Sequence, residues 1–260
     1  MQISVNGHDT FVATGGRDFD PALPVVVMIH GAGFDNSTWS LQSRWLAHHG
    51  HAVLAPDLPG HGRSKGEALT SVAAMADWIV ALLDAAGATQ AWLIGHSMGS
   101  LIALETASRY PDRVSRVSLL GTAATMTVGP ELLANAQAND HAAIDMVSIW
   151  GLGFRAELGG CPSPGLWLHG SAQRVLEATA DGVLHADLNA CNAYGDAAEV
   201  AAGVKAPVTL ILGERDMMTP LKAGKALAAA LPQSRTVVLR GAGHMMMVEQ
   251  PDAVLAALQG

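Results

Sequence analysis

Residues 91–109 of this chain read AWLIGHSMGSLIALETASR. The first four residues form an apolar run that predicts a buried strand, and residues 98–109 predict a helix. Between them, GHSMG fits the pattern G-x-S-x-G, a tight turn from strand to helix that needs small residues around the serine. Such a turn projects Ser97 above the sheet edge as a candidate nucleophile. The amide of Met98, at the helix N-terminus, would point at the same spot, where it could bind an oxyanion.

The same five-residue pattern occurs a second time, as GRSKG at residues 62–66. Proline and glycine residues interrupt the chain just before it, so no strand leads into this second turn. We therefore interpret Ser64 as a loop residue and Ser97 as the candidate nucleophile.

Predicted strands and helices alternate on both sides of the Ser97 turn. A hairpin is predicted around Asn6-Gly7. The β-branched run at 25–29 suits a strand buried on both faces, as in a parallel sheet. Further strands are predicted at 52–55, 114–120, 208–212 and 235–239, and helices at 39–48, 71–86, 221–230 and 251–258. This alternation predicts an α/β fold with a mostly parallel central sheet flanked by helices.

Residues 121–203, here called the insertion, break the alternation. They contain no convincing strand, and helices are predicted at 130–150, 163–180 and 183–194. We interpret them as a helical insertion into a core made of residues 1–120 and 204–260. The insertion has nine acidic and two basic residues, so it carries −7 of the formal net charge of −8. Such an excess of charge predicts a solvated acidic surface.

Composition excludes several classes of protein. Half of the residues are hydrophobic and only 15% are charged, which excludes intrinsic disorder. The chain has no Lys/Arg-rich run of the kind that indicates nucleic-acid binding. No apolar stretch reaches the roughly 18 residues of a membrane span. The N-terminus does not resemble a signal peptide. We therefore expect a soluble, cytoplasmic protein that acts on a small molecule, without nucleic-acid or membrane partners, as either a monomer or a homodimer.

The cysteine and histidine content does not predict a metal site. The two cysteines make neither a disulfide framework nor a C-x-x-C zinc pattern. His185, Asp187 and Cys191 lie close in sequence, but they lack a second anchor elsewhere in the chain. We expect no metal and no cofactor.

Two further strand ends carry an acid and a base. Asp216 closes GERD at 213–216, and His244 closes GAGH after the last predicted strand. A serine hydroxyl needs a histidine base, and the histidine needs a carboxylate to fix its tautomer. Ser97, Asp216 and His244 all follow strands, and sites in open α/β sheets form at the carboxyl ends of strands. Glu214 is the nearest rival to Asp216.

These motifs and their order, Ser97, Asp216, His244, closely resemble the α/β-hydrolase superfamily. The resemblance also rests on three other stretches: HGAG at 30–33 with Trp39, DLPGHGRS at 57–64, and the residues that follow the two strand ends, Pro220 and Glu249 with Pro251. The matching pieces cover residues 25–120 and 208–258.

The resemblance implies a role for each matching residue. Ser97 would be the nucleophile, His244 the base and Asp216 the orienting acid, and the amides of Met98 and Ala32 would form the oxyanion hole. Some relatives place the acid after the preceding core strand, but this chain has Gly-Thr there, at 121–122, which favours Asp216. The family's Gly-x-x-Asp pattern also falls on Asp216. A serine at the turn argues against a haloalkane dehalogenase, which carries aspartate there.

The resemblance further implies that the insertion is a helical cap over the substrate pocket. Six of the 11 methionines stand beside the three proposed catalytic residues, and flexible thioethers let a pocket adapt to differently shaped apolar groups. The residues expected to line the pocket are Gly31, Gly33, Met217, Met245, Trp150 and Trp167.

We therefore expect a serine hydrolase that cleaves a small carboxylic ester or lactone through an acyl-enzyme on Ser97. The acidic insertion favours a neutral substrate. Four alternatives remain open at this point: cleavage of a C–C bond by the same residues, acyl transfer to an acceptor other than water, a non-catalytic ligand receptor, and a cofactor-free oxygenase.

Overall fold

A single sheet organises the chain. The computed structural model describes residues 1–162, 165–195 and 197–260. In these residues, eight strands form one sheet in the order β1-β2-β4-β3-β5-β6-β7-β8. They are β1 (Gln2–Val5), β2 (His8–Ala13), β3 (Val25–Ile29), β4 (Ala52–Pro56), β5 (Ala91–His96), β6 (Val114–Leu120), β7 (Val208–Gly213) and β8 (Arg235–Leu239). Only the pairings of β1 with β2 and of β2 with β4 are antiparallel. The mostly parallel sheet predicted from the sequence is confirmed.

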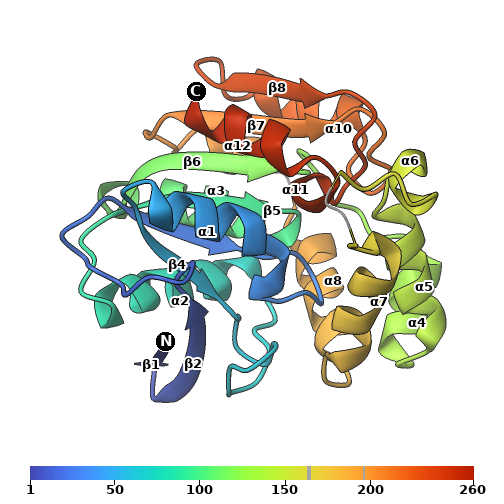
Figure 1. Cartoon of the computed structure of the whole chain (residues 1–260), viewed down its shortest axis with the longest axis horizontal. Coiled ribbons are helices and arrows are strands. Elements are labelled where there is room, and N and C mark those ends of the chain that lie inside the picture. The colour runs from blue at the N-terminus through green and yellow to red at the C-terminus, as the bar shows by residue number, and fades with distance from the viewer. Residues whose placement is uncertain (163–164, 196) are drawn as a thin grey trace.

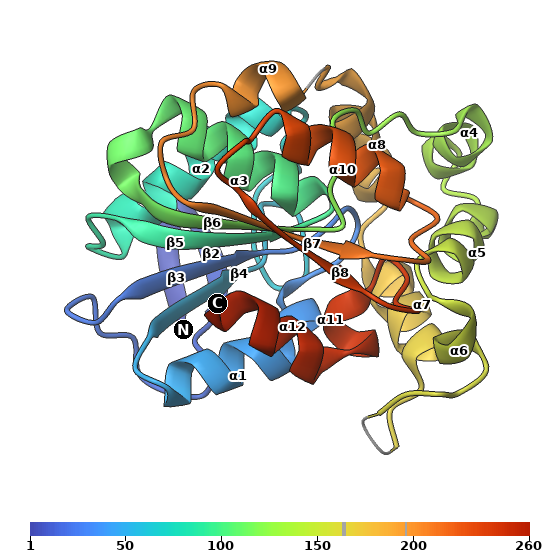
Figure 2. The same cartoon turned by 90° about the horizontal axis from the view of Figure 1, so that it is seen from above.

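Helices cover both faces of the sheet. In Figure 2, α2, α3, α9 and α10 lie on one face, and α1, α11 and α12 lie on the other. Helices α4, α5, α7 and α8 stand together at one end of the sheet (Figure 1). The helices are α1 (Ser40–His48), α2 (Val72–Ala85), α3 (Met98–Arg109), α4 (Pro130–Gln137), α5 (His141–Trp150), α6 (Phe154–Glu157), α7 (Leu168–Ala178), α8 (Val183–Ala193), α9 (Ala197–Ala201), α10 (Leu221–Ala229), α11 (Met246–Glu249) and α12 (Pro251–Gln259), with 3-10 turns η1 (Asn36–Trp39) and η2 (Pro111–Arg113).

Local signals in the sequence explain several boundaries. Asn6 and Gly7 join β1 to β2 and both have positive φ, 51° and 82°, as a two-residue hairpin turn matched to the strand twist requires. The Ser71 hydroxyl accepts a hydrogen bond from the Ala74 amide at 3.2 Å and so caps α2. The predicted hairpin and the predicted helix from residue 71 are confirmed.

The prediction of one helix over residues 130–150 is wrong. Asn139 adopts a left-handed conformation (φ 53°) between α4 and α5, and Asp140 then caps α5 by accepting the Ala142 amide at 2.9 Å. An asparagine followed by an aspartate can thus end one helix and begin another without a proline. The helix predicted at 163–180 corresponds to α7, which begins at Leu168. Ser163 and Pro164, where its start was predicted, lie outside the described residues.

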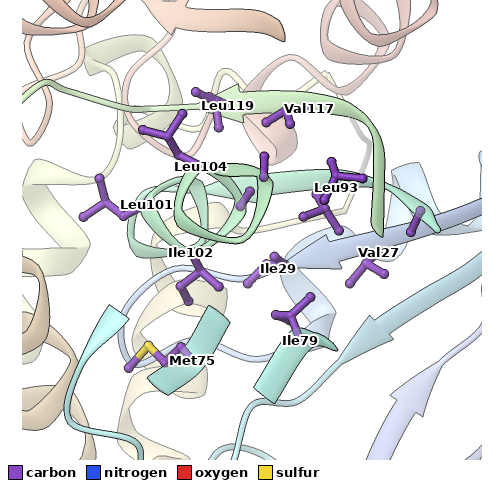
Figure 3. Close-up of a cluster of buried hydrophobic side chains, with 14 of the residues drawn as sticks. Val27, Ile29, Met75, Ile79, Leu93, Leu101, Ile102, Leu104, Val117 and Leu119 are labelled. Atoms are coloured by element: carbon purple, nitrogen blue, oxygen red, sulfur yellow. The ribbon is translucent and has the colours of Figure 1, made fainter. Parts of the chain in front are cut away.

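Apolar side chains pack against each face of the sheet. On the face covered by α2 and α3, Val27 and Leu93 project from strands toward Ile79 and Leu104 (Figure 3). All four are fully buried. Full burial of one such side chain stabilises a fold by about 1.5–3 kcal/mol. This packing holds α3, and with it the turn at its start, in a fixed position on the sheet.

The turn between β5 and α3 depends on two glycines. A Cβ on Gly95 would overlap the carbonyl oxygen of Gly99, and a Cβ on Gly99 would overlap the carbonyl oxygen of Ile29 in β3. Between them, Ser97 has φ 53° and ψ −119°, a region that residues other than glycine rarely adopt. Close backbone approach therefore explains both glycines of the G-x-S-x-G pattern.

Gly99→Ala should lower the free energy of unfolding by about 1–3 kcal/mol, because an added methyl must displace the backbone of β3. Urea denaturation measures this loss. Gly129→Ala is the matched control, since a Cβ at Gly129 meets no atom within 4 Å. Equal unfolding free energies for the two variants would contradict the close-packing explanation.

Candidate active site

His244 and Asp216 form a buried pair. His244 follows β8, Asp216 follows β7, and Nδ1 of His244 lies 2.8 Å from Oδ2 of Asp216. Their side chains are 3% and 0% exposed. A nitrogen this close to a carboxylate carries the proton, so Nδ1 donates and Nε2 is left as the acceptor. The pair has the tautomer that a general base acting through Nε2 requires.

Four hydrogen bonds hold the Asp216 carboxylate. Besides His244, its Oδ1 accepts the amides of Met218 (2.9 Å) and Thr219 (2.7 Å), and its Oδ2 accepts the Thr219 hydroxyl at 2.7 Å. Burial alone would raise the pKa of Asp216, but the charge and hydrogen bond of His244, together with Thr219, outweigh burial and lower it. Asp216 therefore stays ionised. Thr219 was not predicted from the sequence, although an aspartate can bond the backbone two residues on, as Asp216 does with Met218.

Ser97 and His244 open onto one pocket. The pocket has a volume of about 180 Å³ and lies between the carboxyl ends of the strands and the insertion. Among the described residues, no hydrogen bond joins the Ser97 hydroxyl to His244. Such bonds are often long without substrate and shorten when substrate binds.

The loop after β3 lies directly beside Ser97. A Cβ on Gly31 would stand only 3.2 Å from the Cβ of Ser97, so a side chain at this position would push the loop and Ser97 slightly apart. The next residue, Ala32, lines the pocket. In the described chain, neither the Ala32 amide nor the Met98 amide donates to another residue. Both donors are therefore available to a ligand.

His96 supports the backbone of His244. The two rings lie 4.6 Å apart, centroid to centroid, and Nε2 of His96 donates to the His244 carbonyl oxygen at 3.0 Å. Burial, and next the neighbouring His244, hold the pKa of His96 well below its usual value. His96 is therefore uncharged, and its role beside the pocket is to hold the His244 backbone rather than to act as a second base.

Gly121, at the end of β6, leaves room for the His244 ring. Its φ is 56°, and a Cβ there would lie 2.9 Å from both Cε1 and Nδ1 of His244. The ring thus occupies the space above the end of β6.

The pocket includes most, but not all, of the residues predicted to line it. Gly31, Met217, Met245 and Trp150 line it, and Gly33 and Trp167 are not among its described lining residues. Gly33 is instead buried under side chains of α7 and α8, and Trp167 is 67% exposed.

Much of the pocket wall comes from the insertion. Apolar side chains of α4, α5 and α8 and of the segment before α4 contribute, and apart from Trp150 they were not predicted from the sequence to line the pocket. They include Met126, Leu132, Val147, Leu188 and Cys191. No Lys, Arg, Asp or Glu is among the described lining residues. The wall around the candidate nucleophile is therefore uncharged.

The described residues contain neither a metal-binding cluster nor a membrane-spanning helix. In residues 1–162, 165–195 and 197–260, no group of three or more His, Cys, Asp or Glu side chains is arranged to hold a metal ion. None of the helices in these ranges combines the length and the apolar character that crossing a membrane needs.

Comparison with known proteins places this geometry in a family. Residues 26–257 match the Alpha/beta hydrolase family. The pimeloyl-(acyl-carrier protein) methyl ester esterase of Chromobacterium violaceum is 32% identical over 266 residues, covering 95% of this chain and 96% of that protein. The enzyme of the same name from Aromatoleum aromaticum is 30% identical over 88% of this chain and 94% of its own. The enol-lactonase structure from Burkholderia xenovorans LB400 has a TM-score of 0.88 at 26% identity, covering 100% and 98% of the two chains. This chain belongs to the alpha/beta hydrolase family.

Proposed function

We propose that this chain is a cofactor-independent serine hydrolase that cleaves a small, neutral carboxylic ester or lactone through an acyl-enzyme on Ser97. The observation that carries the proposal is the pocket onto which both Ser97 and His244 open, with His244 fixed by Asp216. The relatives, methyl ester esterases and an enol-lactonase, support hydrolysis of an ester bond.

The first half of the reaction acylates Ser97. Nε2 of His244 takes the hydroxyl proton as the Ser97 oxygen bonds to the carbonyl carbon of the substrate. The carbonyl oxygen becomes an oxyanion, which accepts hydrogen bonds from the amides of Ala32 and Met98. The bond to the leaving oxygen then breaks, and His244 gives its proton to that oxygen. In a lactone, the released alcohol stays attached to the acyl group.

The second half returns the enzyme to its starting state. A water molecule gives a proton to His244 as its oxygen attacks the acyl carbon, and the same two amides hold the second oxyanion. The Ser97 oxygen leaves, takes the proton back from His244, and the carboxylic acid departs. Ionised Asp216 stabilises the imidazolium in both halves without itself being protonated.

The pocket wall supports a small, neutral substrate. Its volume of about 180 Å³ is modest, and none of its described lining residues is a Lys or Arg that would pair with a substrate carboxylate. The insertion carries a formal charge of −7, which disfavours approach of anions.

We also propose that the insertion acts as the cap of a core formed by residues 1–120 and 204–260. Its helices α4, α5 and α8 supply pocket wall opposite the strand ends. Because these helices carry apolar side chains rather than reacting groups, the cap would select the substrate while the core performs the chemistry.

Ser97→Ala should lower kcat/KM on p-nitrophenyl esters of graded acyl length by about 10⁴-fold or more, since it removes the atom that is acylated. Ser64→Ala is the matched control, because it changes the serine of the second G-x-S-x-G pattern and should retain turnover. Mass labelling of Ser97 by a fluorophosphonate gives a second measurement. The proposal would be contradicted if wild type turned over every ester and lactone tried no faster than Ser97→Ala does.

Asp216→Asn should lower kcat by about 10⁴-fold, because the amide no longer fixes the His244 tautomer or stabilises its charge. Glu214→Gln, at the rival acid, is the control and should leave kcat little changed. If kcat fell more in Glu214→Gln than in Asp216→Asn, Glu214 rather than Asp216 would be the orienting acid.

The lowered pKa of Asp216 also predicts a pH dependence. The stability that this carboxylate contributes should be fully present above its unfolded pKa of about 3.9 and lost as pH falls through its lower folded value. Urea midpoints of wild type and Asp216→Asn should therefore converge in strong acid. If the difference between the two urea midpoints widened as the pH falls, the predicted direction of the pH dependence would be contradicted.

The monomethyl ester of a short dicarboxylic acid should be hydrolysed at least about tenfold less efficiently than its dimethyl ester, because burying an unpaired carboxylate costs several kcal/mol. The diester is the size-matched neutral control, and kcat/KM at low ionic strength is the measurement. Equal or faster turnover of the half ester would contradict a preference for neutral substrates.

A further inference from the structure

A buried ion pair joins the insertion to the core. Asp187 of α8 is 0% exposed, and its Oδ2 lies 2.8 Å from Nε2 of His61, which follows β4 and is 1% exposed. Nδ1 of His61 lies 3.0 Å from the carbonyl oxygen of Pro59. Both ring nitrogens face oxygen acceptors, so both donate and the ring is an imidazolium.

The surroundings favour this charge on His61. Burial alone would lower the pKa of His61, but the charge and hydrogen bond of Asp187 outweigh it and raise the pKa. The neighbouring ring of His30 behaves in the opposite way. Burial, and next the charge of His61, lower the pKa of His30 to about 4. His30 is thus neutral, with Nδ1 donating to Gly31 and Nε2 accepting the Leu58 amide.

The same Asp187 oxygen also binds the loop that carries Ala32. Its Oδ2 accepts the amide of Gly33, the residue after Ala32, at 2.8 Å. The carbonyl oxygen of Gly33 accepts the hydroxyl of Thr179, also from the insertion, at 2.8 Å. Both backbone polar groups of Gly33 are therefore bonded to side chains of the insertion.

Two leucines of the insertion close over the same residue. Gly33 has φ 71°, and a Cβ there would lie 2.9 Å from Cδ2 of Leu176 in α7 and 2.8 Å from Cδ1 of Leu184 in α8. The loop is therefore held by polar and apolar contacts at once. Its conformation depends on where α7 and α8 lie.

We propose that Asp187 is a positioning residue for the reaction, because its one carboxylate binds both His61 and the Gly33 amide and thereby aims the Ala32 amide at the oxyanion. This inference rests on the proposed function. If Asp187 acts in this way, the oxyanion site is complete only when α8 is packed against the core. The insertion thus contributes to the chemistry through the loop, besides forming pocket wall.

Substitution of Asp187 should affect kcat far more than KM. Displacing an oxyanion donor by a fraction of its bond length weakens transition-state binding, and we expect kcat to fall roughly 10- to 100-fold in Asp187→Ala. KM should change little, since the pocket wall remains. Asp187→Asn should rescue part of the loss, because its amide oxygen can take the place of Oδ2 and still accept from the Gly33 amide, although it lacks the charge that pairs with His61.

Tyr194→Phe is the matched control. The Tyr194 hydroxyl, at the end of α8, donates to Glu105 of α3 at 2.7 Å, so this variant also removes a contact between α8 and the core. The contact does not involve Gly33. We expect Tyr194→Phe to lose stability but to retain kcat.

The experiment measures kcat and KM on an ester series, and amide hydrogen exchange over residues 26–36, for wild type and the three variants. We expect faster exchange of this loop in Asp187→Ala and partial protection in Asp187→Asn. Tyr194→Phe should match wild type. If Asp187→Ala does not fold, Asp187→Asn and Thr179→Val, which removes the other bond to Gly33, take its place.

Two results would overturn the proposal. One is unchanged exchange of the loop when Asp187 is substituted. The other is a kcat loss that Tyr194→Phe shares. If wild type hydrolyses no ester, the proposed function fails, and loop exchange alone then decides whether Asp187 holds the loop. The two failures are therefore distinguishable.

Discussion

The close approach of α3 to the end of β3 is the constraint on which the candidate site depends. Because Gly99 lies against the backbone of β3, α3 must begin immediately after β5, and Ser97 is forced into a left-handed conformation. The Ser97 amide also donates to the carbonyl oxygen of Leu120 at the end of β6. Three neighbouring strands, β3, β5 and β6, thus end around one serine, and the loops after β7 and β8 bring Asp216 and His244 to the same pocket.

The parts of this arrangement that follow from local sequence could be predicted. Uninterrupted apolar runs mark the central strands, which are buried on both faces as expected. Since parallel strands end at a common edge, Ser97, Asp216 and His244 were expected to meet. The structure brings His244 and Asp216 into contact and places Ser97 on the same pocket.

The remaining parts depend on how the insertion docks, which no local pattern encodes. Asp187 lies near His185 and Cys191 in sequence, yet its partner in the fold is His61, 126 residues away. Likewise, the spacing of apolar residues in α4, α5 and α8 does not tell which of them face the pocket and which pack against other helices. The break at Asn139 escaped prediction because asparagine is tolerated inside a helix as well as at its end.

The glycine at the end of β6 limits how such a site can change. An acid at position 121 would need a left-handed backbone and the space that the His244 ring fills. A single substitution that introduces an acid at position 121 would therefore displace the His244 ring and strain the backbone. A change that brings an acid to position 121 would therefore also have to move the loop after β8, which carries His244.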